Sequence, residues 1–410
     1  MKQVVAIALV LWVLPAFGNQ DVEINVNSRY TVEDVEVQAK NKSRLSPALL
    51  ADIQALVGEK LDHKLLDEIG KRIRGALRVH TVVARVARGS SPEYVRVIFE
   101  ARQRPNDFDI SAPKFLYHSK QGWSGVLEVT QPVNDNEFSF GILSDGDELL
   151  ERFAGLKAGY RRMSLGTDNV RLGFQFESYH QQWNRATLIA LEQNPDVPGI
   201  YRTRQNFEPS MTVIPAGSIT WTFGASFQRF QTQFPAARTE AANAVVNSLR
   251  YHRSWEGSEN QHDLDAGYSL RAATTLLDTD FVYTRHTWDA VYSFTRGRNH
   301  VLARFNAGFL FGRAPLYERF VVGNTSTLRG WNKFDLDPLG GTRLAHGTVE
   351  YGYRIFRVFY DTGSVWDRGE EQDVQHSLGL GFRKGRFMLA LAFPVKDGRA
   401  EPIFMAGMNY

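Results

Sequence analysis

One arginine and two downstream carboxylates are the residues of this 410-residue chain best placed to do chemistry together. Arg329 lies in the turn-rich segment Leu328-Arg329-Gly330-Trp331, and Glu350 and Asp361 follow it. A guanidinium fork can satisfy two carboxylates at once, and burying it without such partners is costly. We therefore expect an ion-pair cluster that pins the segment in place. The alternative is that Arg329 lies on a solvated outer loop, where its pairing contributes less than about 1 kcal/mol.

A catalytic role for these residues has weaker support. Asp361-Thr362-Gly363-Ser364 resembles the active-site signature of aspartic proteases, but that chemistry requires two carboxylates that share a proton, and the chain has one copy. The ten histidines include no His-Glu-x-x-His motif, and no Gly-x-Ser-x-Gly elbow is present. We expect no enzymatic activity, no metal and no cofactor.

The elements that position the cluster are strands in which apolar and polar residues alternate. Successive side chains of a strand point to opposite faces, so each such strand has one apolar and one polar face. Val349, Tyr351 and Tyr353 lie opposite Glu350. In the next segment, Val358 and Tyr360 lie opposite Asp361. The two carboxylates therefore share the polar face of a wall whose other face is apolar. A soluble sandwich would also alternate, but a long series of such segments with short turns and aromatic ends is typical of a transmembrane barrel.

The start of the chain predicts secretion. Lys2, an apolar core over 4–14 and the small residues of Ala16-Phe17-Gly18 indicate a signal peptide over 1–18, with an uncleaved anchor as the alternative. No later segment has about 18 uninterrupted apolar residues, so a membrane location requires a closed barrel. The chain has no cysteine, which excludes a lipobox, a disulfide and a thiolate zinc site. Its formal net charge of +3 gives no reason to expect a nucleic-acid partner.

Residues 19–105 predict a small α+β domain with the order strand, helix, helix, strand, strand. Tyr30-Thr31-Val32-Glu33-Asp34-Val35 opens a strand, and Ser46-Pro47 is a helix start. Asp62 can cap a second helix. Two strands follow near 81–87 and 94–101.

Residues 106–410 predict sixteen strands, an even number as bacterial barrels require. The segment 236–246 could instead form a short surface helix. The predicted strands are 123–131, 137–143, 154–165, 170–181, 185–192, 204–213, 218–231, 241–255, 261–276, 281–296, 300–311, 346–355, 356–366, 376–382, 385–395 and 401–410. The fold class is therefore mainly β, a 16-stranded antiparallel transmembrane barrel after one small α+β domain.

Several motifs resemble the Omp85 superfamily of outer-membrane barrels (surface antigen D15 type). The segment from Phe320 to Trp331 is similar to that family's long loop with its Val/Leu-Arg-Gly-Phe/Tyr tip, except that Trp331 replaces Phe or Tyr. Phe359-Tyr360-Asp361-Thr362-Gly363 matches its Phe-x-Asp-x-Gly strand, and the chain ends with the family's aromatic and glycine spacing, with Tyr410 in place of Phe. The resemblance implies that loop 312–345 folds back into the barrel, and that 19–105 is a single POTRA domain in the periplasm.

The resemblance also implies a function without catalysis. Members insert barrel proteins into the outer membrane or carry polypeptides across it, so the expected partners are the outer-membrane lipid bilayer and an extended client polypeptide. Other periplasmic or outer-membrane assembly components could join them. A client would pair with the edge strand 81–87 or with a weak barrel seam between 123–131 and 401–410, marked by Leu127, Pro402, Gly407 and Tyr410. The alternative is a passive channel, or a barrel that exports a lipid or an effector.

Overall fold

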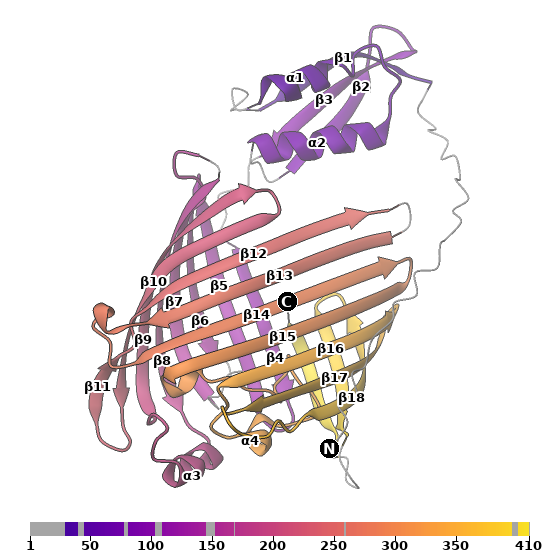
Figure 1. Ribbon diagram of the computed structural model, residues 1–410. Helices are drawn as coiled ribbons and strands as arrows, with labels where there is room; N and C mark the ends of the chain where they lie inside the picture. Colours follow the sequence, from indigo (N-terminus) through magenta and orange to yellow (C-terminus); the bar gives the residue numbers. More distant parts are fainter. Residues whose placement is uncertain are drawn as a thin grey trace. The chain divides into compact units, whose positions relative to one another are not determined.

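The computed structural model describes residues 29–39, 45–77, 81–102, 109–144, 152–167, 169–257, 260–395 and 401–409. The expected signal segment 1–18 and the seam residue Tyr410 lie outside these ranges. The chain divides into two compact units, Met1–Pro105 and Asn106–Tyr410 (Figure 1). Within the described ranges, no helix combines the length and apolarity needed to span a bilayer.

The N-terminal unit is a three-stranded sheet with two helices. Its elements in chain order are β1 (Thr31–Gln38), α1 (Pro47–Gln54), α2 (His63–Leu77), β2 (Thr81–Arg88) and β3 (Tyr94–Arg102). The strand order is β1-β3-β2, with β1 parallel and β2 antiparallel to β3. Apolar side chains from both helices, among them Ile53 and Ile73, pack against Val97 and Phe99 of the central strand. In the strand order β1-β3-β2, β2 is an edge strand.

The start of α1 follows from its local sequence. The Ser46 side chain accepts a hydrogen bond from Leu49 N at 3.2 Å, and Pro47 occupies the first helical turn, where a missing N–H costs nothing. Asp62 accepts from the backbone N of Lys64 at 2.9 Å, just before α2.

The second unit is a closed antiparallel barrel. Within the described residues seventeen segments form its wall, and β11 and β12 share one position because both pair with β10, which leaves sixteen strands. The segments are β4 (Asp109–His118), β5 (Gly122–Val133), β6 (Asn136–Ser144), β7 (Arg152–Arg162), β8 (Val170–Gln182), β9 (Tyr201–Ala216), β10 (Ile219–Thr232), β11 (Arg238–Ala241), β12 (Ala244–Glu256), β13 (Asn260–Ala273), β14 (Val282–Arg296), β15 (Asn299–Arg313), β16 (Arg343–Tyr353), β17 (Phe356–Trp366), β18 (Gln375–Lys384), β19 (Phe387–Pro394) and β20 (Ile403–Asn409).

The predicted class and number of strands are confirmed, but two assignments are wrong. Residues 185–192 form the helix α3 (Arg185–Gln193), whose N-cap Asn184 accepts a hydrogen bond from Ala186 N at 2.8 Å. Helix-favouring alanines and leucines and this cap outweigh the short alternation. The first strand, β4, was missed because Pro113 and a bulge between Ser111 and Lys114 interrupt its alternation. The two errors cancel in the count. The segment 236–246 contains β11 and the start of β12 and forms no helix.

The two faces of the wall differ as the alternation predicts. Apolar side chains such as Phe305, Val349, Val358 and Leu380 are exposed on the outer face. On the inner face, Asp361 and Ser377 are fully buried. An apolar outer band around a polar interior is typical of outer-membrane barrels.

The connection 314–342 between β15 and β16 crosses the barrel interior. It contains a 3-10 turn, η3 (Leu316–Glu318), and a short helix, α4 (Lys333–Leu336). Tyr317 hydrogen-bonds Gln228 on β10, whereas the indole of Trp331 donates to the His376 carbonyl on β18 at 2.8 Å. Since β10 and β18 are far apart around the closed wall, the connection must pass through the lumen. In Figure 1, the segments that carry α3 and α4 lie at the same end of the barrel.

Candidate functional site

The centre of the site is the pairing of Arg329 with Asp361. Arg329 Nε and Nη2 each donate to one oxygen of Asp361 at 2.9 Å, and the Arg329 backbone N donates to the same carboxylate at 3.0 Å. Nη1 donates to Glu350 Oε2 at 3.2 Å. This is the two-pronged geometry for which a guanidinium is suited and an ammonium is not.

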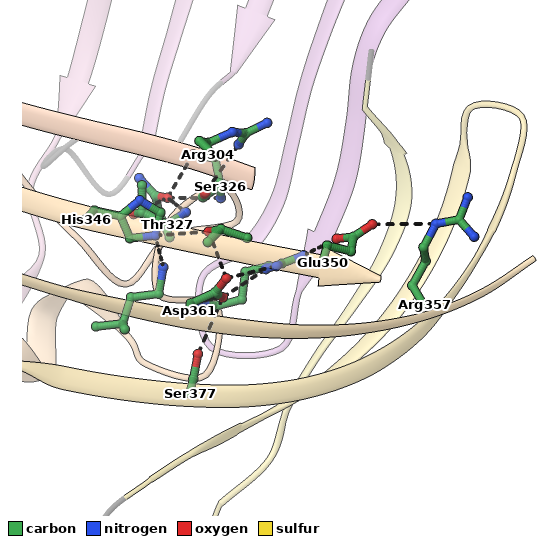
Figure 2. A network of polar contacts seen from close by, with 12 residues as sticks. Arg304, Ser326, Thr327, His346, Glu350, Arg357, Asp361 and Ser377 are labelled. Carbon is green, nitrogen blue, oxygen red and sulfur yellow. Dashed lines mark hydrogen bonds and ion pairs between the residues drawn. The ribbon is translucent and has the colours of Figure 1, made fainter. Parts of the chain in front are cut away.

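Neighbouring side chains complete the pairing. Thr348 Oγ1 donates to Asp361 at 2.9 Å and Ser377 Oγ at 3.4 Å, while Glu350 uses its other oxygen for Arg357 Nε at 3.5 Å. Figure 2 shows Glu350 reaching toward Arg357 and Asp361 toward Ser377. The Arg329 guanidinium also lies 3.4 Å from the ring centroid of Phe359. Each carboxylate therefore has a cationic partner, which limits the cost of burying it.

Contacts with the barrel wall also fix the backbone of the loop tip. Leu328 is fully buried with φ 45°, a left-handed conformation that is uncommon for leucine, and its N–H donates to His346 Nε2 at 3.3 Å. At Gly330 a Cβ would lie 2.6 Å from the Ser377 Cβ and 2.8 Å from the Phe393 carbonyl carbon, so only glycine fits without displacement. The Asn324 Oδ1 accepts from the backbone of Ser326 and Thr327 at 3.0 and 2.9 Å.

A second anchor, on the nearby strands β13 and β14, has the reversed polarity. The buried Glu318 lies 3.4 Å from Arg271 Nε on β13 and 3.6 Å from Arg285 Nε on β14. Tyr283 Oη donates to the same carboxylate at 3.2 Å. Here the loop supplies the carboxylate and the wall supplies the arginines, whereas at the tip the loop supplies the arginine and the wall the carboxylates.

A third anchor lies at the base of the loop. Arg319 Nη2 is 2.6 Å from Asp367, and its Nε donates to the Leu339 carbonyl at 2.8 Å. Burial alone would raise the pKa of Asp367, but hydrogen bonds from Arg319 and Thr342 hold it below its ordinary value. Burial raises the pKa of nearby Asp337 to about 6.

The structure brings together the residues that the sequence grouped. Leu328, Arg329, Gly330 and Trp331 form the tip inside the barrel, and both Glu350 and Asp361 reach the arginine. The sequence reasoning missed Glu318, Arg319 and His346. The Glu318-Arg319 doublet within a loop expected to fold inward was a usable signal, because buried charges require partners.

The bonds on Asp361 argue against the protease reading. Its two oxygens accept hydrogen bonds from Arg329, Thr348 and Ser377. A carboxylate dyad that shares a proton would need a second acid in that place.

The barrel seam differs from the expectation at Leu127. The last strand, β20, pairs with β4 from Met405↔His118 to Asn409↔Lys114, whereas Leu127 lies on β5 and pairs with Ile142 of β6. Leu127 is therefore one strand away from the seam. The expectation was wrong because β4 was not predicted, which made β5 the first strand of the predicted barrel.

Of the other expected seam residues, Gly407 pairs with Leu116 and Pro402 immediately precedes β20. Pro402 therefore removes no hydrogen bond from the paired ladder. Gly407 has φ 149°, and a Cβ there would lie 2.1 Å from the Phe115 carbonyl oxygen. The seam thus requires glycine at this position.

A family model described as the Omp85 superfamily domain matches residues 158–399. The chain belongs to the Omp85 superfamily. A curated relative, the outer membrane protein assembly factor BamA of Nitratidesulfovibrio vulgaris, is 30% identical over 130 residues. That match covers 25% of this chain and 16% of the relative, so the chain spans only a small part of its length.

Solved structures show the same fold. BamA from Haemophilus ducreyi lacking POTRA domains 1–3 has a TM-score of 0.60 at 13% identity, covering 92% of this chain and 84% of that one. CdiB from Acinetobacter baumannii has a TM-score of 0.54 at 14% identity, covering 93% and 74%. At these identities the likeness concerns the fold alone.

Proposed function

We propose that this protein assists the insertion of proteins into the outer membrane, or the passage of polypeptides across it, by pairing with client strands. Membership of the Omp85 superfamily and the similarity to an assembly factor support an outer-membrane location and this class of role. No step in the proposal requires a catalytic side chain.

The observation that carries the proposal is the short seam of the barrel. β4 is ten residues long, but β20 pairs only with Lys114–His118. Among the described residues, 109–113 therefore have no strand on that side. Backbone N–H and C=O groups along an unpaired edge form a template for another strand.

The N-terminal unit supplies a second edge. We infer that it is a POTRA-like module in the periplasm, with β2 free to accept an extended client by β-augmentation. Its side chains vary in exposure, and Val86 is 41% exposed. Backbone pairing at both edges would tolerate many client sequences, because main-chain hydrogen bonds supply much of the affinity.

The folded-in loop weighs against a passive channel. Its contacts reach from Gln228 on β10 to His376 on β18, which places buried side chains where a solute would have to pass. Solutes could pass through the barrel only if this loop moved aside.

Depletion of the protein tests the proposal. The outer-membrane and secreted proteomes are compared before and after depletion, together with uptake of small solutes. Loss of other barrels from the membrane would indicate assembly, and loss of particular secreted polypeptides would indicate translocation. Unchanged proteomes with reduced solute uptake would contradict the proposal and favour the channel.

A further inference from the structure

A basic rim lies at the end of the barrel opposite to the connection 314–342. It consists of Arg298 in the turn between β14 and β15, Arg354 in the turn between β16 and β17, and Lys384 at the end of β18, and all three are exposed. No aspartate or glutamate occurs within three residues of any of them along the chain. Within the part of the chain that the structure describes, no carboxylate pairs with them. Charges of one sign therefore accumulate here.

Backbone hydrogen bonds join the three turns into one surface. Arg354 N donates to the Arg298 carbonyl at 2.9 Å, which brings the first two turns together. Arg383 N, next to Lys384, donates to the Ile355 carbonyl at 2.7 Å, which joins the third turn to the second. A continuous surface of one sign of charge concentrates ions of the opposite sign beside it. The basic rim is therefore suited to a negatively charged ligand.

A surface cavity of about 610 Å³ lies beside the first two of these turns. Its lining residues are Arg296, Gly297, Arg298, Asn299 and Tyr353. The Arg354 Cζ lies 5.6 Å from the ring centroid of Tyr353, so this guanidinium lies beside a wall of the same cavity. Guanidinium groups from two different turns, Arg298 and Arg354, thus flank the cavity at Tyr353.

The outer wall next to the basic rim is aromatic. Tyr353, Phe356, Phe382 and Phe387 are each 43–54% exposed, and the ring centroids of Phe356 and Phe382 are 5.0 Å apart. Aromatic girdles of outer-membrane barrels lie at the interfaces between the bilayer and water. The basic rim therefore lies at the level of the lipid headgroups, where a basic side chain costs little and attracts anionic lipids.

We propose that the basic rim binds the headgroups of anionic phospholipids, and that the cavity beside Tyr353 holds one phosphate group. A guanidinium fork matches two phosphate oxygens. These turns contain no carboxylate that could pair with an ammonium group, so a headgroup with phosphate and without ammonium fits best. An acidic polypeptide fits less well, because the exposed aromatic side chains beside the rim suit acyl chains. The inference requires the outer-membrane location and is independent of client pairing.

Native mass spectrometry of the purified, folded protein tests the basic rim. The protein is released from micelles that contain equal amounts of phosphatidylglycerol and phosphatidylethanolamine with identical acyl chains, and phosphatidylglycerol should be retained in preference. The double variant Arg298→Gln with Arg354→Gln should lower the ratio of retained phosphatidylglycerol to phosphatidylethanolamine by roughly tenfold to thirtyfold, at about 1 kcal/mol for each basic residue. Arg298→Lys with Arg354→Lys should keep most of this preference, because it keeps both charges.

Arg162→Gln with Arg253→Gln is the matched control. Both arginines are exposed at the same end of the wall, on β7 and β12, and their loss removes the same charge. An equal decrease in this control would overturn the proposal, because net charge alone would then explain retention.

Heat-modifiable migration on gels verifies that each variant is folded. If the double glutamine variant does not fold, Lys384→Gln alone carries the test, with a several-fold decrease expected. An unchanged lipid ratio in a folded variant, or equal retention of the two lipids by the native protein, would overturn the proposal. Displacement of phosphatidylglycerol by millimolar inorganic phosphate would indicate a site for free anions, and displacement by a micromolar glutamate-rich peptide would indicate an acidic protein partner. Either result would overturn it too.

Discussion

At the residue scale, Arg329 connects the loop to the wall with its backbone and its side chain at once. Asp361 accepts from the backbone N, Nε and Nη2 of this one residue, and Glu350 takes the remaining nitrogen. Lysine could replace the charge but could not satisfy both carboxylates in this geometry. The pair is therefore a conformational lock, and its loss should affect the loop before the barrel.

Substitution Arg329→Ala tests this lock. Removing one partner from a buried ion pair costs about 3–5 kcal/mol, because the remaining charges stay buried without compensation. We expect a folded, heat-modifiable barrel whose loop becomes accessible to protease and whose activity is lost. Arg368→Ala is the control, since this arginine is exposed in the connection after β17. Full activity with a protected loop in the Arg329 variant would exclude the lock.

The half-buried carboxyl of Asp337 predicts a pH dependence. Burial raises its pKa to about 6, so the folded loop favours the protonated carboxyl. The stability that the protonated carboxyl contributes is lost as the pH rises from about 4 through 6. Asp337→Asn keeps the acceptor for Leu339 N, at 3.0 Å in the native protein, and removes the charge. Thermal unfolding should therefore show a gain of at most about 3 kcal/mol at pH 8 and little gain at pH 4.

Asp335→Asn is the control for that experiment, because Asp335 is exposed in α4 of the same loop. An equal gain for Asp337→Asn at both pH values would show that the carboxyl does not ionise in the folded loop over this range.

At the element scale, strand edges rather than side chains carry the proposed activity. β2 pairs with β3 on one side and has no strand on the other within the described residues. A photo-crosslinking amino acid at Val86 should therefore capture an extended client polypeptide, whereas one at Lys71 on the exposed part of α2 should not. Equal capture at both positions would mean that the edge has no special role.

Local sequence predicted elements well where one signal dominated. Ser46 and Pro47 located α1, and alternation placed Glu350 and Asp361 on the inner face. Prediction failed where signals competed. In β4 a bulge and Pro113 hide the period of two, and this error moved the expected seam to Leu127. Contacts of Glu318 with Arg271 and Arg285 join residues far apart in sequence, so only the closed barrel reveals them.

At the scale of the whole molecule, the apolar outer face requires a membrane. Residues such as Phe140, Val358 and Leu380 are each 50–58% exposed and would otherwise face water. We expect the mature protein, 19–410, to fractionate with the outer membrane and to migrate faster on gels before heating than after. Recovery of the folded protein as a soluble periplasmic species would contradict this.

The central claim, that the seam opens to pair with clients, can be tested with a disulfide across it. The chain has no cysteine, and Ala406 and Tyr117 are register partners on β20 and β4. A second cysteine pair at Ala290 and Phe305, register partners on β14 and β15, controls for the crosslink itself. Cysteine geometry is strict, so complete oxidation must be verified on gels.

The decisive measurement is client insertion or translocation by the oxidised seam variant, before and after reduction. The account predicts that activity is lost while the Ala406–Tyr117 crosslink is complete and returns on reduction, and that the Ala290–Phe305 variant stays active throughout. Full activity of the completely crosslinked seam would contradict lateral opening and favour the passive channel.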